Sequence, residues 1–224
     1  MTVHVNGTDL LVERTGAGRP LVMVHGNGED HTIFDEAVGV LKEDFDCICP
    51  DSRGHGGSAP VSEFHYEDMA EDVIALMEAL DLRGAVFYGF SDGGIVGLLA
   101  AARCSRISTL IVSGANVTPR GVSRRIRLLF RLTYLVRKDP LVRLMIHEPH
   151  ISDGTLRRIT ARTLVLAGSR DMIREKETRH IAETIPGAEL RILDGEDHGS
   201  YIVHSGKIAE IIRAFVREEE ETER

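Results

Sequence analysis

The stretch AVFYGFSDGGIVGLLAAAR, residues 85–103, decides the fold. Its apolar start predicts a buried β-strand over 85–90, and the segment 91–103 predicts a helix. Between them the residues GFSDG at 89–93 form a G-x-S-x-G pattern. A serine on such a strand-to-helix turn is held in a strained backbone conformation with its hydroxyl exposed, and the flanking glycines leave room for neighbouring elements. The pattern therefore predicts Ser91 as a nucleophile.

Short apolar runs alternate with helix-period segments along the rest of the chain. Strands are expected at 21–24, 46–50, 107–113, 163–168 and 188–193, and helices near 31–43, 66–81, 174–184 and 204–217. Buried runs that alternate with helices are typical of a parallel, doubly wound sheet. Two further runs, at 2–5 and 9–14, are joined by Asn6-Gly7, a pair that favours a tight antiparallel hairpin. We predict an α/β fold with a mostly parallel sheet and an N-terminal antiparallel hairpin.

Residues 115–160 interrupt this alternation between two predicted strands. Apolar residues such as Phe130 and Leu135 recur there among arginines, which indicates helix. We therefore expect an α/β core formed by 1–114 and 161–224, with a small helical cap at 115–160. Because open α/β sheets bind ligands at the carboxyl ends of their strands, the cap is predicted to roof the pocket.

A serine hydroxyl is a poor nucleophile at neutral pH, so it needs a base and a third group that orients the base. His198 directly follows the predicted strand at 188–193, where a loop can bring its imidazole over the strand ends. Asp171 follows the strand at 163–168 in the same way. We predict Ser91 as nucleophile, His198 as general base and Asp171 as the orienting acid, in the chain order expected for hydrolases with this turn.

Other carboxylates compete for the role of the orienting acid. Asp197 is adjacent to His198 in the chain, so its side chain diverges from the imidazole. Asp153 and Glu148 lie in the predicted cap and stay open as alternatives. A helix-capping role is the purely structural interpretation of Asp171.

Attack on an acyl carbon places negative charge on the carbonyl oxygen, and preorganised N–H donors are worth about 3 kcal/mol each in stabilising it. The backbone N–H of Asp92, at the start of the helix, is predicted to be one donor. The backbone N–H of Asn27, in the glycine-rich turn HGNG at 25–28, is predicted to be the other. We interpret the Asp92 side chain as a favourable charge in the first helical turn, with attraction of a cationic substrate group as the alternative.

Together these motifs resemble the α/β-hydrolase superfamily over nearly the whole chain. The resemblance is carried by His25-Gly26, DSRGHGGS at 51–58, GFSDGG at 89–94, Asp171 and His198. The chain looks like a capped, bacterial-type member of the carboxylesterase-like branch. This resemblance implies hydrolysis of an ester or related acyl bond through an acyl-enzyme intermediate, without a cofactor. The chain and its cap are short for the family, which leaves the substrate open.

Several rival functions use the same architecture. Thioester, lactone, amide and C–C bond hydrolysis stay open, because the three residues do not encode the leaving group. Haloalkane dehalogenases and epoxide hydrolases resemble this architecture but carry aspartate where this chain has Ser91, and the chain has no tryptophan of the kind that binds halide. A non-catalytic, hydrolase-like binding protein is the alternative from another class, which the complete set of three residues disfavours.

The charge distribution bears on partners. The net charge of −8 disfavours nucleic acid, because phosphate binding needs a basic surface. The segment 116–145 is a local exception, with eight bases and one acid. It could steer anionic acyl substrates or touch acidic lipid headgroups, but we favour a solvated face that pairs with the acidic body. The acidic tail 217–224 is predicted to be a frayed, solvated helix end.

Cys47, Cys49 and Cys104 sit in apolar runs, which favours reduced, buried thiols over a disulfide framework. No histidine or cysteine pair has structural zinc spacing, so no metal is expected. GHGGSA at 54–59 matches G-x-G-x-x-A, but Pro60 follows at once, which argues against a dinucleotide cofactor. Without a leader-like start or a long apolar run, we expect a cytoplasmic protein that acts on a small-molecule acyl substrate without stable membrane insertion.

Overall fold

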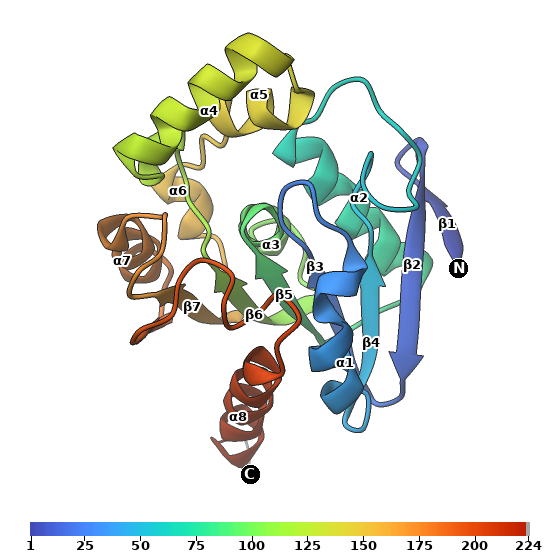
Figure 1. Ribbon diagram of the computed structural model, residues 1–224. Helices are drawn as coiled ribbons and strands as arrows, with labels where there is room; N and C mark the ends of the chain where they lie inside the picture. Colours follow the sequence, from blue (N-terminus) through green and yellow to red (C-terminus); the bar gives the residue numbers. More distant parts are fainter. Residues whose placement is uncertain (223–224) are drawn as a thin grey trace.

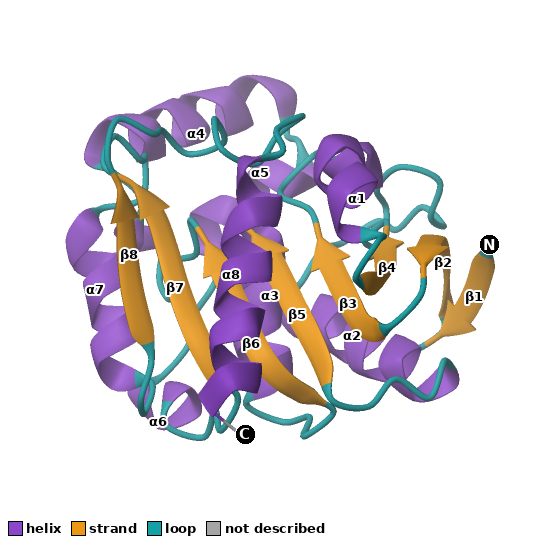
Figure 2. Ribbon diagram, turned by 90° about the horizontal axis from the view of Figure 1, so that it is seen from below, coloured by secondary structure: helices purple, strands orange, loops and turns teal. Residues whose placement is uncertain are grey.

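The computed structural model describes residues 1–222 and has an eight-stranded sheet of order β1-β2-β4-β3-β5-β6-β7-β8 (Figure 2). The strands are β1 (Thr2–Val5), β2 (Thr8–Gly16), β3 (Arg19–Val24), β4 (Phe45–Pro50), β5 (Ala85–Phe90), β6 (Ile107–Ser113), β7 (Arg162–Gly168) and β8 (Glu189–Leu193). The helices are η1 (His31–Phe34), α1 (Asp35–Leu41), α2 (Tyr66–Ala79), α3 (Asp92–Ala101), η2 (Pro119–Gly121), α4 (Arg124–Arg137), α5 (Pro140–His147), α6 (Asp153–Leu156), α7 (Glu175–Thr184) and α8 (Lys207–Thr222). Strands β3 to β8 are parallel, so the predicted fold class is confirmed.

Helices cover both faces of the sheet (Figure 1). Helices α1 and α8 pack on one face around Phe34 and Phe215. Helices α2, α3 and α7 pack on the other face, around residues such as Leu76 and Ile181. Strands β4 and β5 are buried along their whole length, which explains why apolar residues dominate both strands in the sequence. Each large apolar side chain buried in these layers contributes about 1.5–3 kcal/mol to folding.

The N-terminal hairpin forms as the sequence predicts. Asn6 and Gly7 have positive φ angles of 47° and 75°, and the residues that flank them, Val5 and Thr8, are paired. Two consecutive positive φ angles allow the tight turn whose twist matches that of paired strands. Strand β2 then pairs antiparallel with β4, which joins the hairpin to the parallel sheet.

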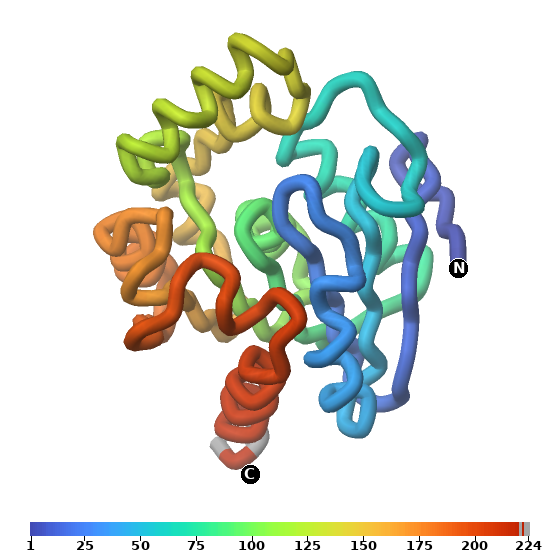
Figure 3. The backbone as a smooth tube through the Cα atoms, in the orientation of Figure 1, coloured from blue at the N-terminus to red at the C-terminus, as the bar shows by residue number. Residues whose placement is uncertain are grey.

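Residues 115–160, here called the helical insert, connect β6 to β7 and contain α4, α5 and α6. In Figure 3 the yellow-green and yellow part of this trace lies apart from the sheet, beyond the loops that follow the strands. The side-chain amide nitrogen of Asn27, which follows β3, lies 3.5 Å from the carbonyl oxygen of Leu141 in α5. The insert therefore lies at the carboxyl ends of the parallel strands, and its role as a roof over the pocket stays a prediction.

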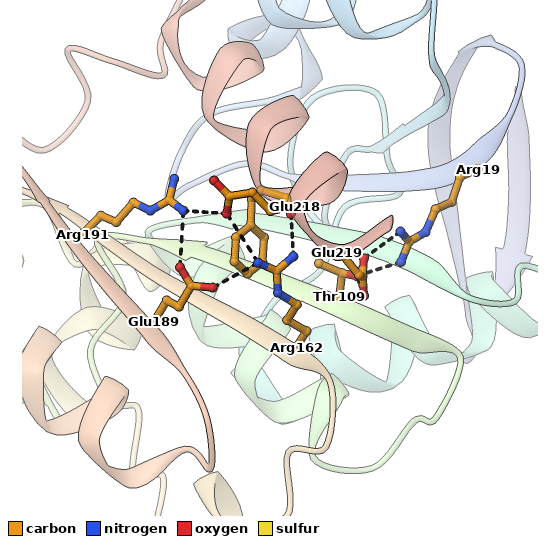
Figure 4. A network of polar contacts seen from close by, with 8 residues as sticks. Arg19, Thr109, Arg162, Glu189, Arg191, Glu218 and Glu219 are labelled. Atoms are coloured by element: carbon orange, nitrogen blue, oxygen red, sulfur yellow. Dashed lines mark hydrogen bonds and ion pairs between the residues drawn. The ribbon is translucent and has the colours of Figure 1, made fainter. Parts of the chain in front are cut away.

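The acidic end of α8 is tied to the sheet (Figure 4). Glu219 accepts hydrogen bonds from Arg19 at 2.8 Å and from the Thr109 hydroxyl at 2.8 Å, and its side chain is only 12% exposed. Glu218 pairs with Arg162 at 3.5 Å. The prediction of a solvated end was wrong for Glu219, because Arg19 of β3 supplies the opposite charge, whereas Glu218 is 52% exposed and stays solvated. The last two residues of the tail lie outside the described part of the chain.

Close packing between α3 and β3 gives a testable consequence. A Cβ on Gly93 would lie 2.0 Å from the carbonyl oxygen of Val24, so one backbone would have to move. We expect Gly93→Ala to lower the free energy of unfolding by about 3 kcal/mol. A Cβ on Gly39 in α1 would meet no other atom within 4 Å, so Gly39→Ala should raise it by about 0.5–1 kcal/mol. Urea unfolding of both variants is the measurement, and similar losses in the two would contradict the packing argument.

Candidate active site

Ser91 stands on a strained turn between β5 and α3. Its φ of 53° and ψ of −113° lie where side chains other than glycine are rarely found. The turn is fixed by a hydrogen bond from Ser91 N to Ser113 O at 2.8 Å and another from Gly93 N to His25 O at 3.1 Å. A Cβ on Gly89 would lie 2.2 Å from Gly93 O, so both flanking glycines are required, as the sequence predicts.

The structure brings Ser91, His198 and Asp171 together. His198 Nε2 lies 3.0 Å from Ser91 Oγ, and His198 Nδ1 lies 2.7 Å from Asp171 Oδ1. With a neutral imidazole protonated at Nδ1, this nitrogen donates to the carboxylate while Nε2 accepts from the serine hydroxyl. Asp171 Oδ1 also accepts from Ile173 N at 2.8 Å, and the Asp171 side chain is only 2% exposed. The carboxylate is thus fixed in place behind the imidazole.

Two glycines that the sequence analysis did not single out allow these loops to meet. Gly114, directly after β6, has a φ of 62°, and a Cβ there would lie 2.7 Å from His198 Cε1. Gly168 ends β7, and a Cβ there would lie 2.3 Å from Glu196 O. Their role depends on which loops cross in space, so no local pattern reveals it.

The alternative acids are engaged elsewhere. Asp197 accepts hydrogen bonds from backbone N–H groups of its own loop at 3.0 and 2.9 Å. Asp153 pairs with His180 at 3.0 Å, and Glu148 pairs with His65 at 2.6 Å. None of these three contacts involves the imidazole that faces Ser91, which leaves Asp171 as its partner.

Asp92 is buried and belongs to a hydrogen-bond network. Its Oδ2 accepts from the side-chain amide of Asn27 at 2.8 Å, and its Oδ1 accepts from the hydroxyl of Tyr66 at 2.8 Å. Burial raises the pKa of Asp92, and these two hydrogen bonds oppose that rise. The carboxylate lies in the first turn of α3, as expected, but it also fastens the loop after β3 to α2 and α3. The sequence analysis missed Tyr66, which appears in the sequence only as part of an apolar helical stripe.

His25 anchors the same loop as a neutral imidazole. Its Nδ1 donates to Gly26 O at 2.8 Å, and its Nε2 accepts from Ser52 N at 3.0 Å. A proton on Nε2 would face the N–H of Ser52, and burial further disfavours the charged ring. Burial lowers the pKa of His25 to about 4. The ring therefore connects the loop after β3 to the loop after β4.

Glu29 is a further carboxylate beside the nucleophile that the sequence analysis missed. Its Oε2 accepts from Gly26 N at 2.9 Å. A Cβ on Gly26 would lie 2.6 Å from that oxygen and 3.2 Å from Ser91 Cβ, which places Glu29 close to the serine. Burial raises the pKa of Glu29, while the hydrogen bond from Gly26 lowers it. Its position in the HGNGED stretch is the one sequence signal that could have identified it.

Asp30, His31 and Asp51 form the one cluster of three potential metal ligands found among residues 1–222. Asp51 Oδ1 accepts from both the backbone N–H and the Nδ1 of His31, each at 2.8 Å. Asp30 Oδ1 accepts from Thr32 N at 2.9 Å as the cap of η1. These hydrogen bonds account for the cluster as a loop-forming unit, and it carries no argument for a metal.

The three cysteines are buried and unpaired, as the sequence predicts. Burial raises the pKa of the Cys47 thiol to about 12, so this group stays protonated at neutral pH. The pKa of Cys49 is shifted in the same direction by the same cause. The thiols therefore act as small apolar core groups.

Comparison with known proteins agrees with this geometry. The model of the alpha/beta hydrolase fold family matches residues 19–134, which is more than half of the chain. The chain belongs to this family. No helix within the described part of this hydrolase-fold protein has the length and apolar character needed to cross a membrane.

Individual relatives resemble the chain to different extents. An esterase structure from Exiguobacterium antarcticum superposes with a TM-score of 0.84 at 22% identity and covers 97% of this chain and 99% of that chain, which shows the shared fold. The AB hydrolase superfamily protein YisY of Bacillus subtilis is 38% identical over 42% of this chain and 36% of its own length. The human serine hydrolase BPHL is 37% identical over 51% of this chain and 42% of its own length. The matches to these two curated relatives span less than half of each relative.

The low pKa of His25 gives a pH prediction. The folded protein holds this ring neutral down to about pH 4, whereas the unfolded chain protonates it near its ordinary value of 6.5. The unfolded state therefore binds more protons in this window, so stability is lost as the pH falls through it, by about 3 kcal/mol in total from this residue. Urea unfolding from neutral pH down to pH 4 should show a smaller loss in His25→Gln than in the unaltered protein. Equal pH slopes would contradict the assignment.

Proposed function

We propose that this chain is a serine hydrolase that cleaves a small-molecule ester or related acyl bond through an acyl-enzyme intermediate. The observation that carries the proposal is the continuous hydrogen-bonded row from Ser91 Oγ through His198 to Asp171, with distances of 3.0 and 2.7 Å. A serine is activated when a base contacts its hydroxyl and a buried carboxylate orients that base, and these three residues have this arrangement. A hydrolase-like binding protein would have no need of it.

Each residue has a defined task in this mechanism. Ser91 Oγ attacks the acyl carbon while His198 Nε2 takes the hydroxyl proton, and Asp171 stabilises the imidazolium that forms. The tetrahedral intermediate collapses as His198 returns the proton to the leaving alkoxide, which leaves the acyl group on Ser91. Water then gives its proton to His198 and attacks the acyl carbon, and the carboxylic acid departs as Ser91 regains its proton.

The backbone N–H groups of Asn27 and Asp92 are proposed to bind the oxyanion. Within residues 1–222, no hydrogen-bond acceptor is recorded for either N–H. The side chains of the same two residues are hydrogen-bonded to each other at 2.8 Å, which fixes the spacing between the two donors. Preorganised donors of this kind stabilise the transition state by about 3 kcal/mol each, because they need no reorientation when charge develops.

An ester is the substrate class favoured by the comparisons. The solved structure named above is an esterase, and one curated relative is called a serine hydrolase. Within the helical insert, α5 is proposed to form the cap surface that selects the acyl group, because α5 lies beside Asn27. Thioester, lactone, amide and C–C bond hydrolysis use the same three residues and are the alternatives that a substrate panel would separate.

A labelling experiment tests the nucleophile. A fluorophosphonate probe should label the unaltered protein, and Ser91→Ala should abolish the labelling. Nitrophenyl ester turnover should fall about 10⁴-fold or more in Ser91→Ala. The matched control is Ser62→Ala, a change at an exposed serine, which should leave both signals intact. Labelling that persists in Ser91→Ala would refute the assigned nucleophile, and an unaltered protein with neither labelling nor turnover would favour the binding-protein alternative.

The network around Asp92 predicts a second effect on turnover. Asp92→Asn replaces one of the two acceptor oxygens by an NH2 group, so either Asn27 or Tyr66 loses its acceptor and the loop that carries one oxyanion donor loosens. Loss of one such buried hydrogen bond is worth about 1–2 kcal/mol, so we expect kcat/KM to fall about tenfold or more. Tyr66→Phe, which removes one donor without a clash, should cost less. Because the carboxylate acts through the loop, neutral and amine-bearing esters should lose equally; a loss confined to amine-bearing esters would instead assign Asp92 to substrate binding.

A further inference from the structure

Helix α4 of the helical insert exposes an unusual amount of apolar surface. Five of its side chains, here called the α4 stripe, are between 53% and 84% exposed: Leu128, Leu129, Leu132, Leu135 and Val136. Elsewhere in the described residues the exposed large hydrophobic side chains are Met1, at 51%, and Val40, at 37%. Spacings of three, four and seven residues place the five side chains on one face of the helix. Soluble monomers rarely expose such contiguous patches without a binding role.

The opposite face of α4 is the one that packs on the protein. Ile126, Phe130 and Tyr134 recur every four residues and are partly buried. Phe130 lies with Met145 and Ile146 of α5 around a small cavity. The stripe therefore points away from the body of the protein, and its exposure does not result from a missing contact with α5.

The charges on α4 are all of one sign and have no ionic partners. Residues 124–138 contain five arginines and one lysine but no aspartate or glutamate. None of these six cations forms an ion pair with any residue in the described range 1–222. Arginines elsewhere behave differently: Arg53 pairs with Asp72 at 2.5 Å, and Arg103 pairs with Glu67 at 2.6 Å. Of the segment 116–145, Arg143 in α5 pairs with Glu63 at 3.8 Å, but the expected pairing with the acidic body is absent along α4 within the described residues. Five of its six cations are exposed and available to an external anion, the exception being Arg127.

We propose that α4 docks this protein peripherally on an anionic lipid surface. A bilayer with anionic headgroups presents phosphate charge directly above a hydrocarbon layer, so it can pair with the arginines and take up the α4 stripe at the same time. A second copy of this chain offers no equivalent surface. Its apolar match would be its own α4, which brings six cations against six. Among residues 1–222, the exposed large hydrophobic side chains outside the stripe are only Met1 and Val40.

Docking through α4 leaves the reacting groups untouched. The stripe lies on the exposed face of α4, whereas Ser91 and His198 are held by the loops after β5 and β8. Binding to lipid is therefore independent of ester turnover in solution. Failure of the proposed hydrolysis would not affect the docking, and failure of docking would not affect the hydrolysis.

Vesicle sedimentation of the full chain tests the proposal. The unaltered protein should bind vesicles of equal parts phosphatidylglycerol and phosphatidylcholine at least about tenfold more tightly than vesicles of phosphatidylcholine alone. Leu132→Ser with Leu135→Ser should weaken this binding about tenfold or more, as should Arg131→Glu with Arg137→Glu. Raising the salt to about 1 M should weaken it too, because screening shortens the reach of the charges.

Matched controls separate the stripe from general effects of charge or hydrophobicity. Lys42→Glu with Lys176→Glu makes the same change in net charge at exposed sites away from α4, and Val40→Ser removes an exposed apolar side chain from α1. These variants should bind vesicles within about twofold of the unaltered protein. Short nitrophenyl esters should be hydrolysed equally by every α4 variant, which also confirms folding, and Ser91→Ala should bind vesicles normally.

Three outcomes would overturn the proposal. The first is no binding to either vesicle, and the second is equal binding to the charged and neutral vesicles. The third is a dimer in sedimentation equilibrium that dissociates in Leu132→Ser with Leu135→Ser while vesicles remain unbound, which would assign the stripe to contact between two copies.

Discussion

The backbone of Ser91 is the constraint on which the rest of the site depends. A non-glycine residue at positive φ costs about 1–3 kcal/mol and persists only where its surroundings fix it from several sides. Here the fixing contacts come from the end of β6 and from the residue after β3: Ser91 N donates to Ser113 O at 2.8 Å, and Gly93 N donates to His25 O at 3.1 Å. The turn is therefore held by both neighbours of β5 in the sheet, so the packing of the sheet stabilises the strained backbone of Ser91.

Close backbone packing also positions the loops that carry Asp171 and His198. Gly114 directly follows β6 and Gly168 ends β7, and each would clash with the loop that carries His198 if it had a Cβ. Parallel strands end at one edge of the sheet, which brings their loops close together, but only residues without side chains let the loops reach hydrogen-bonding distance. The His198 imidazole is thus positioned by backbone packing, and Asp171 only has to fix its orientation.

Much of the fold could be predicted because its signals are local. Apolar runs, helical periodicity and the Asn6-Gly7 turn each act over a few residues, and the positions of Asp171 and His198 follow from strand ends that such runs reveal. What escaped prediction depends on residues far apart in sequence. Tyr66 reaches Asp92 across 26 positions, and Glu219 reaches Arg19 across 200, so neither contact leaves a pattern in the chain.

The two errors about charge have a common physical origin. The composition of a segment gives the sign of its net charge, but it does not say which groups its charged side chains contact. Glu219 in the acidic end of α8 lies against Arg19 of β3, so it is paired and mostly buried, whereas the cations of α4 have no ion pair within residues 1–222. The insert meets the site through other groups: Ser123 N donates to Met172 O at 2.9 Å next to Asp171, and Leu141 O lies near Asn27. These contacts do not involve the exposed face of α4. That face can therefore bind a separate partner without any change in the geometry around Ser91.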